Sequence, residues 1–266
     1  MMLWQRIVSA LIAIPPVLWA VYAGGWPFMI LLSLMAILAW HELQSIQAEP
    51  DPLILWLGYL LLLPVLYAGW RWPEGFLPLL TVAVLVLLAA LLWRYETARW
   101  PLVTHAVTSF CYLSLPTVHL TRLGSLPSGW RWITLLLVTV WSYDSFAFFI
   151  GSRHGRRKPW PHISPNKSVE GVLGGLLGST LAATVAFRLL LPDLGLGALL
   201  AYALPFGLIV GVLAQTGDLF ESALKRAFAV KDSGRFLPGH GGLLDRIDSV
   251  LFATPFVYYF LIMFVL

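Results

Sequence analysis

The sequence predicts an all-α, polytopic integral membrane protein with about nine transmembrane helices. Of its 266 residues, 59% are hydrophobic and only 11% are charged, whereas an ordinary globular domain carries about 25% charged residues. The mean hydropathy is +0.81, and runs of about 20 apolar residues, long enough to cross a bilayer, recur along nearly the whole chain. Trp26, Trp70 and Trp93 stand at the ends of such runs, where amphipathic rings settle at headgroup level, and this favours helices over a barrel.

The expected spans follow one another along the chain with mostly short connections. The single cysteine, Cys111, lies inside one of them, which excludes a disulfide framework and a Cys-rich zinc site. The spans are expected at residues 7–22, 26–46, 52–70, 76–93, 102–120, 132–150, 169–191, 198–215 and 247–266.

The distribution of basic residues predicts the orientation of the chain. If the amino terminus is cytoplasmic, all of the 17 Lys and Arg residues except Arg71, Arg122, Arg131 and Arg188 fall on the cytoplasmic side, as the positive-inside rule requires. We therefore expect a multi-pass protein of the inner (plasma) membrane. Its amino terminus and its polar loops at 151–168 and 217–246 are expected to face the cytoplasm, and with them any active site that these loops help to form.

The two ends of the chain differ in polar content. Within residues 1–100 the charges, Glu42 among them, are scattered and offer little chemistry. This region is predicted to be structural, lipid-facing or dimer-forming, and residues 101–266 are predicted to be the catalytic transmembrane region.

The seventh expected span contains overlapping small-xxx-small pairs, which let helix backbones approach closely. The pairs are Gly171 with Gly175 and Gly174 with Gly178. Packing within the chain is the simpler interpretation, and a homodimer remains open.

Acidic residues gather at two helix termini, one at the end of the eighth expected span and one at the start of the ninth. Asp218, Glu221, Ser222 and Lys225 are spaced at i, i+3, i+4 and i+7, so one helical face carries two acids, a hydroxyl and an amine. Because Asp218 directly follows an apolar run, its burial is expensive and needs a reason beyond a solvated helix end.

The last span opens with a second acidic group. Asp245, Asp248 and Ser249 share a face, and capping explains one acid in a first turn but not two. Asp144 lies deeper, inside the span 132–150, as a third candidate metal or proton site. If these helix ends converge, their hard oxygen ligands suit Mg²⁺ or Mn²⁺, with room for a second metal ion.

The polar loops carry features suited to phosphate. Lys167 and Ser168 precede a predicted helix, whose amino-terminal amides attract anions, although the pattern of a Walker A loop is absent. Gly241 and Gly242 allow backbone amides to approach phosphate oxygens. His240 has no Cys or His partner at metal spacing, so hydrogen bonding to a phosphate or carboxylate is a better interpretation than zinc binding.

The segment 222–249, "SALKRAFAVKDSGRFLPGHGGLLDRIDS", resembles the signature of the phosphatidate cytidylyltransferases, also called CDP-diacylglycerol synthases. The resemblance covers roughly the second half of the chain. One departure is Val169, where the family usually has Trp, and the residues around Asp144 are also untypical. Weaker family elements occur in order: the Asp-x-x-Ala segment 144–147, a basic loop, then Ser164, Pro165, Lys167, Glu170 and Gly171, and then "GDLFES".

The resemblance implies transfer of a cytidylyl group from CTP to phosphatidic acid, giving CDP-diacylglycerol and pyrophosphate with Mg²⁺ or Mn²⁺, and no nucleic-acid partner. It assigns divalent metal to Asp218, Asp245 and Asp248, with Asp144 and Glu221 as further candidates. Ser222 and His240 would position oxygens. The phosphates would be held by Ser164, Lys167, Lys225, Arg226, Lys231, Gly241, Gly242 and Arg246.

Three alternatives stay open at this point. A CTP-dependent lipid kinase would use similar groups but would release CDP, and a cytidylyltransferase could act on a variant lipid phosphate. An ion or proton transporter would explain Asp144 but not the acids, lysines and glycines gathered in the loops.

Overall fold

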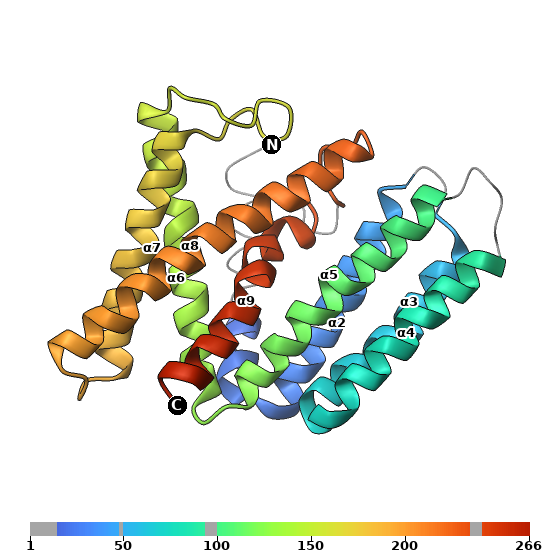
Figure 1. Ribbon diagram of the computed structural model, residues 1–266, viewed down its shortest axis with the longest axis horizontal. Helices are drawn as coiled ribbons and strands as arrows, with labels where there is room; N and C mark the ends of the chain where they lie inside the picture. The colour runs from blue at the N-terminus through green and yellow to red at the C-terminus, as the bar shows by residue number, and fades with distance from the viewer. Residues whose placement is uncertain (1–14, 48–49, 94–99, 235–240) are drawn as a thin grey trace. The chain divides into compact units, whose positions relative to one another are not determined.

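The structure is a computed structural model that describes residues 15–47, 50–93, 100–234 and 241–266. Residues 15–23 are helical. The further helices are α2 (Gly25–Ser45), α3 (Pro52–Arg71), α4 (Pro73–Trp93), α5 (Trp100–Ser125), α6 (Gly129–His154), α7 (Val169–Leu190), α8 (Leu196–Ala227) and α9 (Leu244–Phe264) (Figure 1).

The predicted all-α membrane architecture is confirmed. Within the described residues, 7 helices are long and apolar enough to cross a bilayer: α2, α3, α4 up to Ala90, α6, α7, α8 and α9. The expected span at 102–120 corresponds to α5, which is not among the seven, and the expected span at 7–22 lies partly outside the described residues. The count of about nine therefore stays a prediction.

The chain divides into two compact units. Unit 1 comprises Met1–Pro127 together with Asp232–Arg246, and unit 2 comprises Ser128–Lys231 together with Ile247–Leu266. The helix α9 therefore begins in unit 1 and continues in unit 2. The boundary between the units falls after Pro127, whereas the sequence was divided at residue 100. The predicted division of roles between residues 1–100 and 101–266 stays a prediction.

Unit 1 is built around a buried tryptophan on α2. The indole nitrogen of Trp40 donates to the carbonyl of Leu55 on α3 at 3.0 Å, and its ring meets the edge of Phe110 on α5 at a centroid distance of 6.1 Å. A Cβ at Gly58 would lie 2.0 Å from the Trp40 ring, so only glycine lets α3 pack there. These contacts fix the carboxyl-terminal half of α2 against α3 and α5.

Unit 2 is centred on the close pair α6 and α7, which make the most extensive helix contact in the structure. A Cβ at Gly175 would lie 2.6 Å from the Tyr143 ring, and a Cβ at Gly178 would lie 2.5 Å from Phe146. Gly174 packs in the same way against Ile150. The small residues of α7 therefore serve packing within the chain, and the homodimer stays a prediction.

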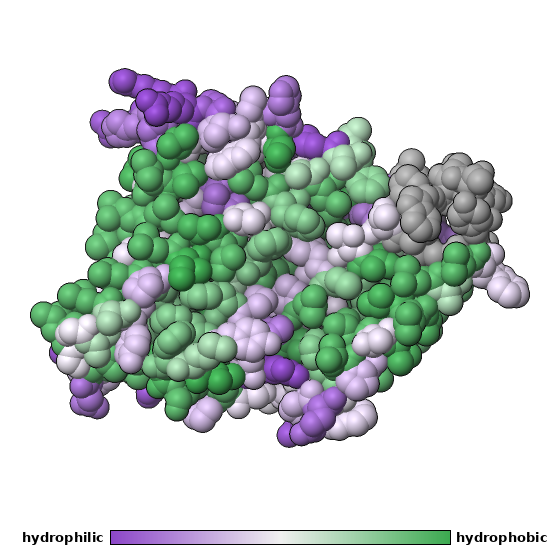
Figure 2. Space-filling view, viewed as in Figure 1, coloured by the Kyte–Doolittle hydropathy of each residue, from purple (hydrophilic) through white to green (hydrophobic). Residues whose placement is uncertain are grey.

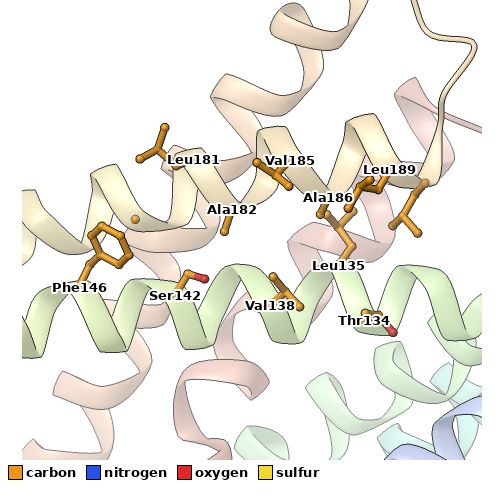
Figure 3. A pocket seen from close by; sticks show the side chains of 12 residues that line it. Thr134, Leu135, Val138, Ser142, Phe146, Leu181, Ala182, Val185, Ala186 and Leu189 are labelled. Atoms are coloured by element: carbon orange, nitrogen blue, oxygen red, sulfur yellow. The ribbon is translucent and has the colours of Figure 1, made fainter.

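Apolar side chains cover much of the visible surface, and hydrophilic residues gather over the connection between α6 and α7 (Figure 2). A groove of about 390 Å³ lies between α6 and α7, where Val138 and Phe146 face Leu181 and Val185 (Figure 3). Such a surface suits contact with lipid chains, as expected for helices that span a bilayer.

Candidate active site

The polar face predicted for residues 218–225 lies on α8. This helix runs from Leu196 to Ala227 without a break, so the spacing inferred from the sequence holds in space. Glu221 is 1% exposed, and one of its carboxylate oxygens contacts the ammonium of Lys225 at 2.5 Å. The hydroxyl of Ser222 donates to Asp218 at 3.4 Å. Together these residues form a polar stripe at the carboxyl-terminal end of a mainly apolar helix.

Lys167 connects the start of α7 with this stripe on α8. Its Nζ lies 2.6 Å from Oδ2 of Asp218. The lysine stands directly before Ser168, the N-cap of α7, whose hydroxyl accepts the amide of Gly171 at 3.2 Å. Because the cap fixes the backbone next to it, Lys167 is held at a helix amino terminus, where anions are favoured.

Asp248 joins the same group from α9. It is 6% exposed, and its Oδ1 accepts the amide of Ser249 at 2.6 Å. Its carboxylate lies within electrostatic range of Asp218, Asp144 and Lys167. The metal site expected from the sequence depended on convergence of these helix ends, and the structure brings the end of α8 that carries Asp218 together with the start of α9 that carries Asp248.

A glycine on α8 allows this convergence. A Cβ on Gly217 would lie 2.6 Å from the carbonyl oxygen of Asp248 and 2.9 Å from the Cβ of Phe252. The backbones of α8 and α9 therefore touch at Gly217, one residue before Asp218. Any larger side chain would push the two acidic residues apart.

Asp144 lies on α6 and is exposed at its own position. Its neighbour Tyr143 is buried and donates its hydroxyl to Oε1 of Gln215 on α8 at 2.6 Å. Gln215 precedes Asp218 by three residues, so this hydrogen bond ties α6 to α8 just before the polar stripe. Asp144, Lys167, Asp218 and Asp248 are named the unit 2 cluster below.

The donor set of the unit 2 cluster fits a divalent cation. A buried carboxylate close to a second one is costly unless a positive charge offsets it, and carboxylate oxygens are the ligands that Mg²⁺ and Mn²⁺ prefer. Within the part of the chain that the structure describes, no three His, Cys, Asp or Glu side chains already stand in position to hold a metal ion together. In the present arrangement the ammonium of Lys167 supplies the positive charge beside Asp218.

The basic loop between α6 and α7 is tied down by its own polar groups. Oε2 of Glu170 accepts the amides of Arg156 at 3.0 Å and Arg157 at 3.3 Å, and Lys158 donates to the carbonyl of Asn166 at 2.7 Å. Glu170, noted in the sequence only as a family element, thus holds the loop that precedes Lys167.

Arg226 and Ser164 both lie at the basic loop between α6 and α7. The guanidinium of Arg226 donates to the carbonyls of Ile163 at 3.4 Å and Val230 at 3.2 Å, while Ser164 lies in the turn before Lys167, its amide bonded to the carbonyl of Trp160. Lys231 is exposed at the end of this part of unit 2. Their expected roles toward phosphate stay predictions.

The remaining predicted residues lie in unit 1. One of them is Asp245, whose hydrogen-bond partners differ from those of Asp248. Oδ2 of Asp245 accepts the amide of Gly242 at 2.9 Å and the hydroxyl of Ser233 at 3.1 Å. Gly241 adopts a φ of +82°, which favours glycine. Arg246 is exposed. His240 lies outside the described residues.

One residue of this part of unit 1 was missed from the sequence. Glu42 on α2 accepts the amides of Leu243 and Leu244, whereas in the sequence it stands among the scattered charges of residues 1–100. The available signal was a carboxylate inside an otherwise apolar span, which is a reason to expect a specific role.

These features define a class of protein: a polytopic helical membrane protein in which acids of α8 and α9 and a lysine at the start of α7 lie together. The sequence profile described as "Cytidylyltransferase family" matches residues 4–264. The chain belongs to this family and is therefore a nucleotidyltransferase.

Relatives in several bacteria support the assignment, and each is named phosphatidate cytidylyltransferase. The protein of Bacillus subtilis (strain 168) is 37% identical over 268 residues, which cover 98% of each chain. The protein of Thermotoga maritima is 38% identical over 86% of this chain and 85% of its own, and that of Staphylococcus aureus (strain COL) is 31% identical over 94% and 95%. The similarity therefore extends beyond the second half and includes the amino-terminal region.

Proposed function

We propose that this chain transfers the cytidylyl group of CTP to phosphatidic acid. An oxygen of the lipid phosphate attacks the α-phosphorus of CTP, the bond from that phosphorus to the β-phosphate oxygen breaks, and pyrophosphate leaves with CDP-diacylglycerol as the other product. The observation that carries the proposal is the contact of Lys167 with Asp218 beside the buried Asp248, in a chain of this family.

The chemistry asks for charge compensation more than for a base. The lipid phosphate is already an anionic nucleophile, so the protein must bring two polyanions together and stabilise the charge around the α-phosphorus. A divalent ion held by Asp218 and Asp248, with Asp144 as a further candidate, would neutralise phosphate oxygens and orient them. Mg²⁺ or Mn²⁺ is the proposed cofactor.

Lys167 is proposed to change partners during the reaction. In the described structure its ammonium contacts Asp218. If Asp218 held a divalent cation, Lys167 would be available to bind a phosphate oxygen at the amino terminus of α7, where the helix dipole also favours an anion. Lys225, Arg226 and Ser222 follow Asp218 on α8 and are proposed to position phosphate oxygens.

The proposed location is the inner membrane of the cell, with the amino terminus and the active site in the cytoplasm, where CTP is present. The asymmetric distribution of Lys and Arg supports this orientation. Labelling of an Arg153→Cys variant in a Cys111→Ser background should succeed only with a membrane-permeant reagent in intact cells. A homodimer is retained as a proposal for sedimentation analysis in detergent.

The decisive experiment uses purified full-length protein in lipid nanodiscs with CTP, Mg²⁺ and phosphatidic acid. The expected products are pyrophosphate and a lipid that carries CMP, in equal amounts. Release of CDP with a phosphorylated lipid would instead identify a kinase. Ion flux into proteoliposomes without CTP would identify a transporter.

A further inference from the structure

Glu42 lies on α2, yet its buried carboxylate contacts the start of α9, which follows about 200 residues later in the sequence. Glu42 is 5% exposed. Its Oε1 accepts the amide of Leu243 at 2.8 Å and its Oε2 accepts the amide of Leu244 at 2.9 Å. The hydroxyl of Ser233 lies 3.3 Å from Oε2 and 3.1 Å from Oδ2 of Asp245, so its single proton is shared between the two carboxylates. Two charged hydrogen bonds to consecutive amides fix both the position and the direction of the chain at that point.

The surrounding residues are shaped to admit this carboxylate. A Cβ on Gly234 would lie 2.6 Å from Oε1 of Glu42, and a Cβ on Gly242 would lie 2.7 Å from Oε2. Only glycine therefore fits on either side of the carboxylate. Ser233 links Glu42 to Asp245, because its hydroxyl lies within hydrogen-bond distance of both carboxylates.

The helix that carries Glu42 is itself fixed. His105 on α5 bonds the carbonyl of Leu43, the next residue, through Nε2 at 2.7 Å. Trp40, two residues earlier, is fully buried and bonded to α3. A rigid anchor of this kind is what transmits position to a bound segment, whereas an exposed carboxylate would only cap the helix.

We propose that Glu42 is a positioning residue for the cytidylyl transfer. It acts through the amides of Leu243 and Leu244 to hold the segment 241–245, which contains the predicted phosphate-binding glycines Gly241 and Gly242 and the predicted metal ligand Asp245. The inference rests on the proposed function. It also gives the amino-terminal region a part in catalysis, beyond a structural one.

The test compares Glu42→Gln with Glu74→Gln in full-length protein in nanodiscs. Glu74 is an exposed acid in the first turn of α4 and provides the matched control. A glutamine at 42 turns one of its two oxygens into a donor that faces an amide, so peptides covering 241–246 should exchange their amide hydrogens faster. The Glu74→Gln protein should exchange that segment at the normal rate.

Kinetics then separate positioning from stability. We expect kcat of Glu42→Gln to fall roughly 10- to 100-fold, as for other residues that orient a functional group through hydrogen bonds, with the KM for phosphatidic acid nearly unchanged. Glu42→Asp, which keeps both acceptor oxygens, should recover part of kcat. A purely structural role would lower the midpoint of thermal unfolding and leave kcat of the folded protein at the control value.

Each outcome decides the inference. Unchanged exchange at 241–246 in Glu42→Gln overturns the contact, and normal kcat despite faster exchange overturns the positioning role. If Glu42→Gln does not fold, Ser233→Ala removes one donor to the same carboxylate and should show the same pattern at smaller size. Wild-type protein that turns over no CTP would refute the proposed function and the kinetic part of this inference, while amide exchange would still decide the contact.

Discussion

The two units use their carboxylates in different ways. In unit 1, Glu42 and Asp245 accept main-chain amides and the hydroxyl of Ser233. In unit 2, Asp218 and Glu221 contact the ammonium groups of Lys167 and Lys225. An amide is part of the backbone and cannot leave, whereas a lysine side chain can swing to another anion. We therefore expect Glu42 and Asp245 to hold a segment of unit 1 in place, and the lysine–carboxylate pairs of unit 2 to exchange partners during the reaction.

Removal of the divalent ion is expected to have the largest effect on activity, and it tests whether the carboxylates of unit 2 hold a metal. We expect excess chelator to abolish product formation, because two polyanions cannot approach without charge compensation. Added Mg²⁺ or Mn²⁺ should restore the rate, measured as pyrophosphate release. Full activity in excess chelator would remove the metal from the proposal and leave lysine and arginine residues as the source of positive charge.

Substitution of the unit 2 acids should have the next largest effect. Asp218→Asn or Asp248→Asn should lower kcat by about a thousand-fold or more, as expected when charge stabilisation of a transition state is lost. The exposed Asp193→Asn is the matched control. The variants should keep the thermal unfolding midpoint of the control, and near-normal turnover in either one would contradict its assignment.

A smaller effect is expected for Asp245→Asn, and this variant sharpens the comparison directly. Asp245 is engaged by Gly242 and Ser233, so its loss should loosen the segment 241–245 and reduce kcat by about ten-fold, near 1.4 kcal/mol. The measurement is kcat beside that of Asp248→Asn. Equal losses in the two variants would show that the two acids act alike.

Lys167→Gln should weaken the use of CTP by about ten-fold or more. Loss of one charged contact to phosphate costs about 1.5–3 kcal/mol, which should appear mainly as a higher KM for CTP. Lys158→Gln is the matched control on the same loop, because Lys158 donates to the carbonyl of Asn166. An unchanged KM in Lys167→Gln would indicate that the lysine only pairs with Asp218.

The smallest effect on activity is expected from packing changes on α7. Gly175→Ala would bring a Cβ to 2.6 Å from the Tyr143 ring and should destabilise the protein by about 1–3 kcal/mol. At Gly197 nothing lies within 4 Å of an added Cβ, so Gly197→Ala is the matched control. The thermal unfolding midpoint measures the difference, and an unchanged midpoint in Gly175→Ala would contradict the close packing of α6 and α7.

Much of this architecture could be predicted because it depends on local patterns. Apolar runs revealed the helices, and i, i+3, i+4 spacing placed Asp218, Glu221 and Ser222 on one face of α8. Contacts between distant segments could not be predicted in this way. Nothing in the sequence near Glu42 indicates that its partners lie about 200 residues later, where Leu243 and Leu244 offer their amides.

The same limit applies to Asp245 and Asp248. Their spacing places both on one face of a helix, and so the sequence assigned both to metal. Their neighbours separate them: Ser233 and Gly242 bond Asp245, while Asp248 lies near Asp218 and Lys167. Helical periodicity reports which residues share a face but not which groups from other segments meet that face.

The tight pair formed by α6 and α7 has a consequence for biosynthesis. The two helices are neighbours in the chain, and contacts between neighbours form quickly because little loop entropy is lost. As the chain leaves the ribosome, this hairpin can enter the bilayer and close on its glycines before α8 exists. Asp144 and Lys167 are then already in place, and the cluster is completed only when α8 supplies Asp218 and α9, the last helix, supplies Asp248.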